Sequence, residues 1–408
     1  MDWLNQVIEQ VGLDGITRQV VRTVGPIILI LIGAGLTILG RLIWRQLLVI
    51  NCFMHSRSRA LNAVKRIKSK DGLQEGKGIW LQPTSKPENY EESFVSRVLV
   101  VANNKGGVAK TTLCANLAAY WAKEWKKRVL IIDVDYQGSV SSMALRTIKD
   151  WISKRCDSLA TRAISGDLKP NILVQCAKEV PGEPRLKVIP AYYDLAQADN
   201  RLMIEWLLGC ARRRSKTIFR SMADLLVGKL FVRQDVRYNL YELLHTKAVQ
   251  EAFDIVITDC PPRVSTGVIQ ALCAARHVLI PTILDLPSAE ATVSFCNELQ
   301  ELKKQGICPK LNYAGIVGTM VSANVDQIAE RAALEKIRDG LRDIHFPSGL
   351  LAEEHFMRKY TAFVKDAEEG IAYLTMGDAQ IREAIGSLAE YVASMVELPK
   401  PAHHEMKG

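Results

Sequence analysis

A loop with two lysines and two glycines follows a short apolar segment of the sequence. Residues 98–102 read VLVVA, which is typical of a buried parallel strand, and residues 103–112 read NNKGGVAKTT. Apolar residues at helical spacing begin at Leu113. In this order of strand, loop and helix, the loop N–H groups and the helix N-terminus give a fixed positive potential that suits phosphate. The pattern therefore predicts a phosphate-binding loop.

The predicted loop also carries the side chains that ATP and Mg²⁺ require. Its residues are Lys105, Gly106, Gly107, Val108, Ala109, Lys110, Thr111 and Thr112. We expect Lys110 to reach the β- and γ-phosphates and the Thr111 hydroxyl to coordinate Mg²⁺. The ordinary GxxxxGK[ST] pattern is not satisfied, because Asn104 and Ala109 occupy its two glycine positions. ATP with Mg²⁺ is the predicted cofactor pair.

Three carboxylates follow two further apolar segments. Residues 128–139 read RVLIIDVDYQGS and residues 253–262 read FDIVITDCPP, which puts Asp133, Asp135 and Asp259 at or just beyond strand ends. The carboxyl ends of the strands are where an open α/β sheet binds its ligands. An ordinary turn is the alternative for a single aspartate at a strand end. After this loop, the three together are expected at the edge of the sheet where the fold binds its ligands.

These segments together resemble the deviant Walker A ATPases of the ParA and MinD type, whose KGGxxKT pattern also occurs in the nitrogenase iron protein. The resemblance covers about residues 97–397. It implies that Asp135 positions the attacking water and that Asp133 faces the loop threonine and the metal waters. It further implies that Asp259 holds the Mg²⁺ water shell, and that Lys105 reaches across a homodimer to the partner's phosphates.

Three more segments complete the predicted fold. Residues 186–191, 277–284 and 312–320 read LKVIPA, HVLIPTIL and NYAGIVGTM, each typical of a buried strand. Strands that alternate with helices predict a doubly wound, mostly parallel α/β sheet of the P-loop NTPase type. Tyr136 departs from the resemblance, because the family commonly has a proline there, and Ala109 replaces its usual glycine.

The N-terminal region predicts a membrane segment. The eighteen residues 23–40 carry no charge, and at about 1.5 Å per residue they span roughly 27 Å, close to the thickness of a bilayer core. A buried or interfacial helix is the alternative. The predicted organisation is therefore an N-terminal segment at 1–22, a transmembrane helix at 23–44, a basic juxtamembrane segment and linker at 45–96, an ATPase domain at 97–398 and a flexible tail at 399–408.

The charges around this region predict its orientation. Arginines and lysines follow it from Arg41 to Lys70, whereas residues 1–22 hold both signs. The positive-inside rule then puts the ATPase domain in the cytoplasm, on a single-pass protein of the inner membrane. The basic stretch 57–70 is either a solvated face or a surface that attracts anionic lipid headgroups.

A second basic segment, residues 211–237, contains a triple arginine and few acids. One interpretation is non-specific DNA binding through phosphate contacts, and another is contact with acidic lipid. A solvated helix face is the third. The sequence leaves all three open.

The composition excludes several classes of protein. With 48% hydrophobic and 24% charged residues the chain is not globally disordered, and its nine cysteines form no CxxC pair. Free cysteines favour a reducing compartment. The function expected from the resemblance and the N-terminal segment is a membrane-tethered ATPase that dimerises around ATP and Mg²⁺. It would use hydrolysis as a conformational switch to position or regulate an unidentified partner protein. Two alternatives are a relative of polysaccharide-export tyrosine kinases, although the last tyrosine here is Tyr391, and a nucleotide-binding scaffold without hydrolysis.

Overall fold

The computed structural model of the protein divides the chain into two compact units, Met1–Arg66 and Ile67–Gly408. It describes isolated positions between 37 and 47 and between 79 and 90, and then residues 92–146, 158–210, 235–322, 327–359, 370–375 and 378–401. The second unit contains the predicted ATPase domain.

One sheet of seven strands forms the centre of this unit, in the order β3-β4-β2-β5-β1-β6-β7. Neighbouring strands are parallel, except that β3 and β4 are antiparallel. The predicted doubly wound, mostly parallel sheet is therefore confirmed. The strands are β1 (Val98–Val101), β2 (Val129–Asp133), β3 (Lys178–Val180), β4 (Glu183–Ile189), β5 (Ile255–Asp259), β6 (His277–Ile283) and β7 (Asn312–Thr319).

Apolar residues on both faces of the strands bury the sheet between two hydrophobic cores. Along β1, Val98 and Val100 belong to one core, whereas Leu99 and Val101 belong to the other. This alternation follows from the period of two in a strand, and it explains why the strand sequences are continuously apolar. The short β3, which reads KEV, carries no such signal and was not predicted from the sequence.

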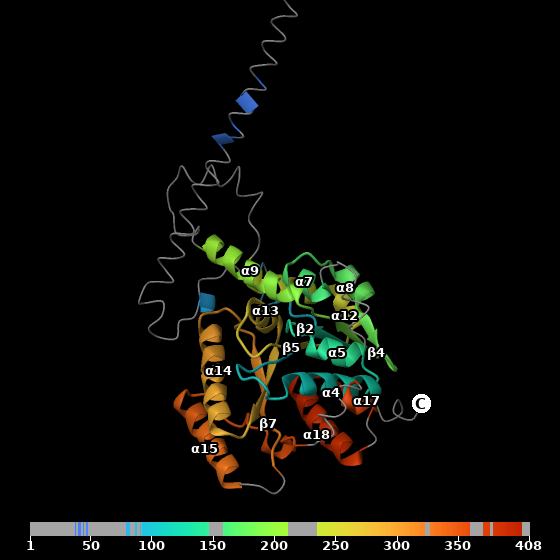
Figure 1. The fold of residues 1–408 in the computed structure, drawn as a ribbon, viewed down its shortest axis with the longest axis vertical. Helices are drawn as coiled ribbons and strands as arrows, with labels where there is room; N and C mark the ends of the chain where they lie inside the picture. The colour runs from blue at the N-terminus through green and yellow to red at the C-terminus, as the bar shows by residue number, and fades with distance from the viewer. Residues whose placement is uncertain are drawn as a thin grey trace, which may run out of the picture. The chain divides into compact units, whose positions relative to one another are not determined.

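Helices cover both faces of the sheet (Figure 1). The first face is covered by α4 (Lys110–Lys123), α5 (Ser139–Leu145), α17 (Ala372–Thr375) and α18 (Ala379–Met395). The opposite face is covered by α7 (Leu159–Ile164), α8 (Pro170–Cys176), α9 (Asp194–Cys210), α11 (Asn239–Leu244), α12 (Lys247–Ala252), α13 (Thr266–Ala274), α14 (Leu286–Lys304) and α15 (Gln327–Asp343). Three short 3₁₀ helices are η1 (Ile79–Leu81), η4 (Val236–Tyr238) and η5 (Glu353–His355).

The register of the central strands places the predicted chemistry at one edge. Val101, the last residue of β1, lies opposite Asp259 at the end of β5. On the other side of β5, Asp259 lies opposite Asp133 at the end of β2. The loop after β1 and two of the three carboxylates therefore meet at the carboxyl edge of the sheet.

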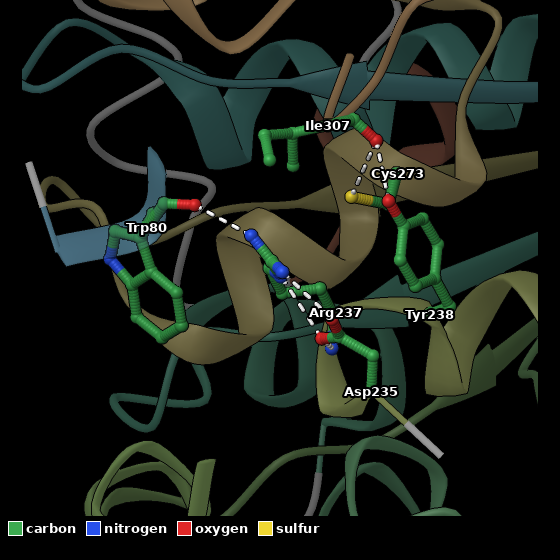
Figure 2. A network of polar contacts seen from close by, with 6 residues as sticks. All are labelled: Trp80, Asp235, Arg237, Tyr238, Cys273 and Ile307. Atoms are coloured by element: carbon green, nitrogen blue, oxygen red, sulfur yellow. Dashed lines mark hydrogen bonds and ion pairs between the residues drawn. The ribbon is translucent and has the colours of Figure 1, made fainter. Parts of the chain in front are cut away.

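A buried network joins the segment before β1 to the domain (Figure 2). Arg237 is completely buried and forms an ion pair with Asp235 at 2.7 Å. Its Nη1 donates to the backbone carbonyl of Trp80 at 2.7 Å, and its guanidinium lies 4.8 Å from the Trp206 ring centroid. Trp80 in turn stacks on Trp206. The folded unit thus begins before residue 97, earlier than the sequence predicted.

The same network corrects the interpretation of the second basic segment. Arg237 lies in the core as the partner of Asp235, so it does not belong to a basic surface. A buried guanidinium requires a counter-ion and full hydrogen bonding, both of which this site supplies. Residues 211–234, the remainder of that predicted segment, lie outside the described residues, as do residues 402–408 of the predicted tail.

Of the predicted transmembrane helix at 23–44, the structure describes Thr37, Gly40, Arg41 and Trp44 alone. Within the described part of the chain, no helix combines the length and the apolar character needed to cross a bilayer. The membrane segment therefore stays a prediction.

His245 connects the pH of the solution to the stability of this unit. The Ser96 N–H donates to its Nδ1 at 3.2 Å, and its Nε2 lies 2.7 Å from the Ala274 carbonyl oxygen. The ring therefore carries its proton on Nε2, and a second proton would displace the Ser96 bond. Burial lowers the pKa of His245 to about 4.

Because of His245, we expect the free energy of unfolding to decrease as the pH is lowered from about 6.5 to about 4. In this range the unfolded chain binds a proton that the folded chain does not, which costs about 1.4 kcal/mol per pH unit. Urea denaturation of the wild type and His245→Gln at pH 7, 6 and 5 measures the effect. Carboxylates titrate equally in both proteins, so the slope of the wild type should exceed that of the variant. Parallel slopes would contradict the prediction.

Candidate active site

The loop between β1 and α4 folds around the ammonium group of Lys110. Lys110 is the first residue of α4 and is 7% exposed, and its Nζ donates to the backbone carbonyl of Lys105 at 2.7 Å. Gly106 and Gly107 are exposed, whereas Val108 is buried. Burial lowers the pKa of Lys110, and the negative charge of Asp259 opposes that fall. A buried cation therefore lies against the loop, while the predicted contact of Lys110 with phosphate stays a prediction.

Ala109 has an unusual backbone conformation at the N-cap of α4. Its φ of 60° and ψ of 27° are left-handed. That region costs an L-residue about 1–2 kcal/mol relative to the right-handed one, and glycine avoids the cost. The glycine position of the ordinary loop pattern thus keeps its glycine-like geometry although alanine occupies it.

We expect Ala109→Gly to raise the free energy of unfolding by about 0.5–1 kcal/mol. The relief of the left-handed strain exceeds the roughly 0.4–1 kcal/mol by which glycine stabilises the unfolded chain. Thermal melting without nucleotide measures the change. Ala118→Gly in the buried middle of α4 is the matched control and should be destabilising. If both glycine variants melt below the wild type, Ala109 is not strained.

The pair formed by Thr111 and Asp259 fits the water shell of a magnesium ion. The Thr111 hydroxyl donates to Asp259 Oδ2 at 2.8 Å, which joins two residues that are 148 positions apart. Asp259 is completely buried, and within the described residues its Oδ1 has no hydrogen-bond partner. Burial, together with the nearby Asp133 charge, raises the pKa of Asp259. A hydrated cation at this point would supply both the missing donors and the missing positive charge.

Asp133 holds the loop after β2 in place. Its Oδ1 accepts a hydrogen bond from the Asp135 N–H at 3.0 Å, and its Oδ2 accepts from the Ser141 hydroxyl at 2.6 Å and the Ser141 N–H at 3.1 Å. Burial raises the pKa of Asp133 to about 7. The Thr111 hydroxyl bonds to Asp259, so the role of Asp133 in the metal shell stays a prediction.

Asp135 lies in the turn that leads into α5. It is 8% exposed, and its Oδ1 accepts the Gln137 N–H at 3.0 Å. The turn requires glycine at position 138, where φ is 63° and a Cβ atom would lie 2.8 Å from the Ala191 carbonyl oxygen. Asp135 is therefore fixed beside Asp133, at the same edge as the loop.

The sequence did not single out two polar residues that support this site. Asn103 is buried, and its Nδ2 donates to the Pro281 carbonyl at 2.8 Å while its Oδ1 accepts the Lys105 N–H at 3.3 Å. The Ser141 hydroxyl accepts a hydrogen bond from the Ala191 N–H and donates one to Asp133, so it links the two residues. Asn103 directly follows a buried strand, which is a usable signal, whereas nothing in the sequence relates Ser141 to Asp133.

Comparison with known proteins agrees with this geometry. Residues 96–313, more than half of the chain, match the protein-family model described as an AAA domain. The chromosome partitioning protein ParA of Myxococcus xanthus is 30% identical over 234 residues, which are 57% of this chain and 68% of that protein. This chain belongs to the ParA-type family of P-loop ATPases. The predicted ParA/MinD-type P-loop family is thereby confirmed, whereas the deviant Walker A loop and the membrane segment stay predictions.

Other relatives of this ParA-type ATPase support the same assignment. The chromosome-partitioning ATPase Soj of Thermus thermophilus is 28% identical over 225 residues, which are 55% of this chain and 69% of Soj. Among solved structures, apo McdA from Cyanothece has a TM-score of 0.53 at 17% identity, over 73% of this chain and 99% of McdA. The ATP complex of a substituted McdA has a TM-score of 0.52 at 17% identity, over 73% of this chain and 96% of that one. The two McdA structures show the shared fold.

Proposed function

We propose that this ParA-type ATPase binds ATP with Mg²⁺ at the loop after β1, hydrolyses ATP, and uses the cycle to position or regulate a partner. The observation that supports this most directly is the Thr111–Asp259 hydrogen bond. It lies next to the buried Lys110 ammonium and to a buried Asp259 oxygen that has no donor in the part of the chain that the structure describes. This arrangement offers a cation for phosphate and an incomplete shell for Mg²⁺.

Each residue has a proposed role in hydrolysis. The loop N–H groups and Lys110 bind the β- and γ-phosphates and stabilise the negative charge that develops on them. Thr111 and Asp259 hold the Mg²⁺ shell, to which Asp133 contributes. Mg²⁺, when bound, neutralises phosphate charge. Asp135 orients the attacking water in line with the bond that breaks.

Dimerisation around ATP is the proposed form of the switch, with Lys105 reaching the partner's phosphates. Exposed apolar residues at the carboxyl edge of the sheet support it. Tyr193, Leu286 and Met320 are 75%, 54% and 39% exposed, and they follow β4, β6 and β7. The order of strands places Tyr193 on one side of β1 and the other two on the opposite side. An apolar rim on both sides of a nucleotide site fits a second copy of this chain.

We further propose that residues 23–44 tether the ATPase to the inner membrane, with the ATPase domain in the cytoplasm. The uncharged stretch and the arginines and lysines after it support this location. Residues 211–234 would then contact acidic lipid or DNA. The names of the ParA and Soj relatives point to partition, so a cargo or activator protein is the expected partner.

Phosphate release under single-turnover conditions tests this function. Membranes that contain the full chain are solubilised, and excess protein is mixed with radiolabelled ATP, with Mg²⁺ or with EDTA. We expect phosphate release in the presence of Mg²⁺ and none in the presence of EDTA. In light scattering, we expect a dimer with a non-hydrolysable ATP analogue and a monomer with ADP. Nucleotide binding without release would favour a scaffold, transfer of label to tyrosine would favour a kinase, and no binding would refute the proposal.

A further inference from the structure

The loop after β5 reaches toward two other loops at the site. Its residues 260–265 read CPPRVS and lie between Asp259 and the first turn of α13. A Cβ atom on Gly106 would lie 3.9 Å from Pro262 Cβ, so this loop borders the phosphate-binding loop. The next residue, Arg263, has an exposed side chain. Its guanidinium carbon lies 5.4 Å from the ring centroid of Tyr136, in the loop after β2.

The far end of the same loop is held by α9. Asp199 accepts the Gly267 N–H at 2.9 Å through Oδ1, and its backbone carbonyl accepts the Thr266 hydroxyl at 2.9 Å. Burial raises the pKa of Asp199, and the positive charge of Arg263 opposes that rise. The Arg263 guanidinium therefore interacts with the Tyr136 ring and also with the negative charge of Asp199. The loop that carries Arg263 is anchored at both ends.

Tyr136 directly follows Asp135, so the position of its ring constrains the carboxylate that orients the water. The bases of the two loops are already joined, because the Val134 N–H donates to the Asp259 carbonyl at 3.0 Å. The Arg263–Tyr136 contact joins them again further out, on the other side of Asp135. Tyr136 is half-buried against the core, which leaves its ring little freedom to turn away.

We propose that Arg263 and Tyr136 act as a pair of positioning residues for hydrolysis. The guanidinium holds the Tyr136 ring, and through it the turn that contains Asp135, in register with the loop after β5. This inference rests on the proposed ATPase function and adds two residues to it. A cation over an aromatic ring at a solvent-accessible site contributes enough to change a rate about 2- to 5-fold.

A double-mutant cycle on single-turnover hydrolysis tests the pair. Arg263→Gln and Tyr136→Leu are each expected to lower the rate of the chemical step up to about 5-fold, while ADP affinity stays at the wild-type value and a cooperative thermal transition shows that each variant is folded. Because both changes break one contact, the double variant should be no slower than either single variant. Tyr136→Phe keeps the ring and should recover most of the rate that Tyr136→Leu loses.

Arg382→Gln is the matched control, because it removes a similar contact, a guanidinium 5.5 Å from the Tyr373 ring centroid, at a residue to which the proposed hydrolysis assigns no role. It should hydrolyse ATP at the wild-type rate. Independent, multiplying losses in the double variant would overturn the pair, as would a slow Arg263→Gln with an unaffected Tyr136→Leu. If the wild type itself releases no phosphate, the proposed function fails and this inference fails with it.

Discussion

Lys110→Ala is expected to abolish ATP binding. The ammonium group of Lys110 is held by the Lys105 carbonyl, in a site where the charges of Asp259 and Asp135 act on it. Removing it takes away the one side-chain cation that this proposal places on the phosphates within the same chain, while the carboxylates remain. The loss of one buried charge contact costs about 2–5 kcal/mol, which weakens binding at least ~30-fold.

Titration with a fluorescent ATP analogue measures this loss, and thermal melting without nucleotide shows that the variant is folded. Lys123→Ala is the matched control, because Lys123 lies in the last turn of the same helix, far along α4 from the loop. It should bind the analogue as the wild type does. Equal affinity of Lys110→Ala and the wild type would mean that nucleotide does not bind at this loop.

Asp135→Ala has the second large expected effect, and it acts on the rate rather than on binding. Positioning and polarisation of a water by a carboxylate contribute roughly 10²- to 10⁴-fold. The side chain contacts neither the loop lysine nor Thr111 through any hydrogen bond within the described residues, and its Oδ1 accepts the Gln137 N–H. ATP affinity should therefore persist while hydrolysis nearly stops, and the protein should accumulate as an ATP-bound dimer.

Asp135→Asn distinguishes the role of the negative charge in hydrolysis from the role of the side chain in the turn. Asparagine still offers an oxygen to the Gln137 N–H, so the turn into α5 stays intact. We expect Asn to be as slow as Ala in single-turnover assays, with light scattering showing the trapped dimer in both. If Asn retained the wild-type rate, Asp135 would serve the turn and another group would orient the water.

The sequence alone was sufficient for six of the seven strands and for the loop. A parallel strand that is buried on both faces has to be apolar throughout, so VLVV and VLIID are legible as β1 and β2. The phosphate-binding loop is also local, since its lysine, threonine and glycines lie within one short segment. Family membership followed from the same residues, and the comparisons confirmed it.

The sequence could not show how distant residues combine. The Thr111–Asp259 bond and the Asp133–Ser141 bonds depend on strand order, which no segment reveals by itself. Arg237 counts as one more basic residue in the sequence, but the fold buries it between Asp235 and two tryptophans. The left-handed Ala109 is equally invisible, because the turn that imposes it is set by the ends of β1 and α4.

The sequence thus determined which groups are available for phosphate and metal chemistry, because residue type and local spacing decide what a segment can bind. The tertiary structure decided that Asp259 accepts the Thr111 hydrogen bond, that Arg237 is buried, and that Arg263 lies over the Tyr136 ring. The physical reason is that burial and long-range hydrogen bonding exist only after the sheet has formed. A charge that would be solvated in the unfolded chain then has to take the partner that the packed elements place beside it.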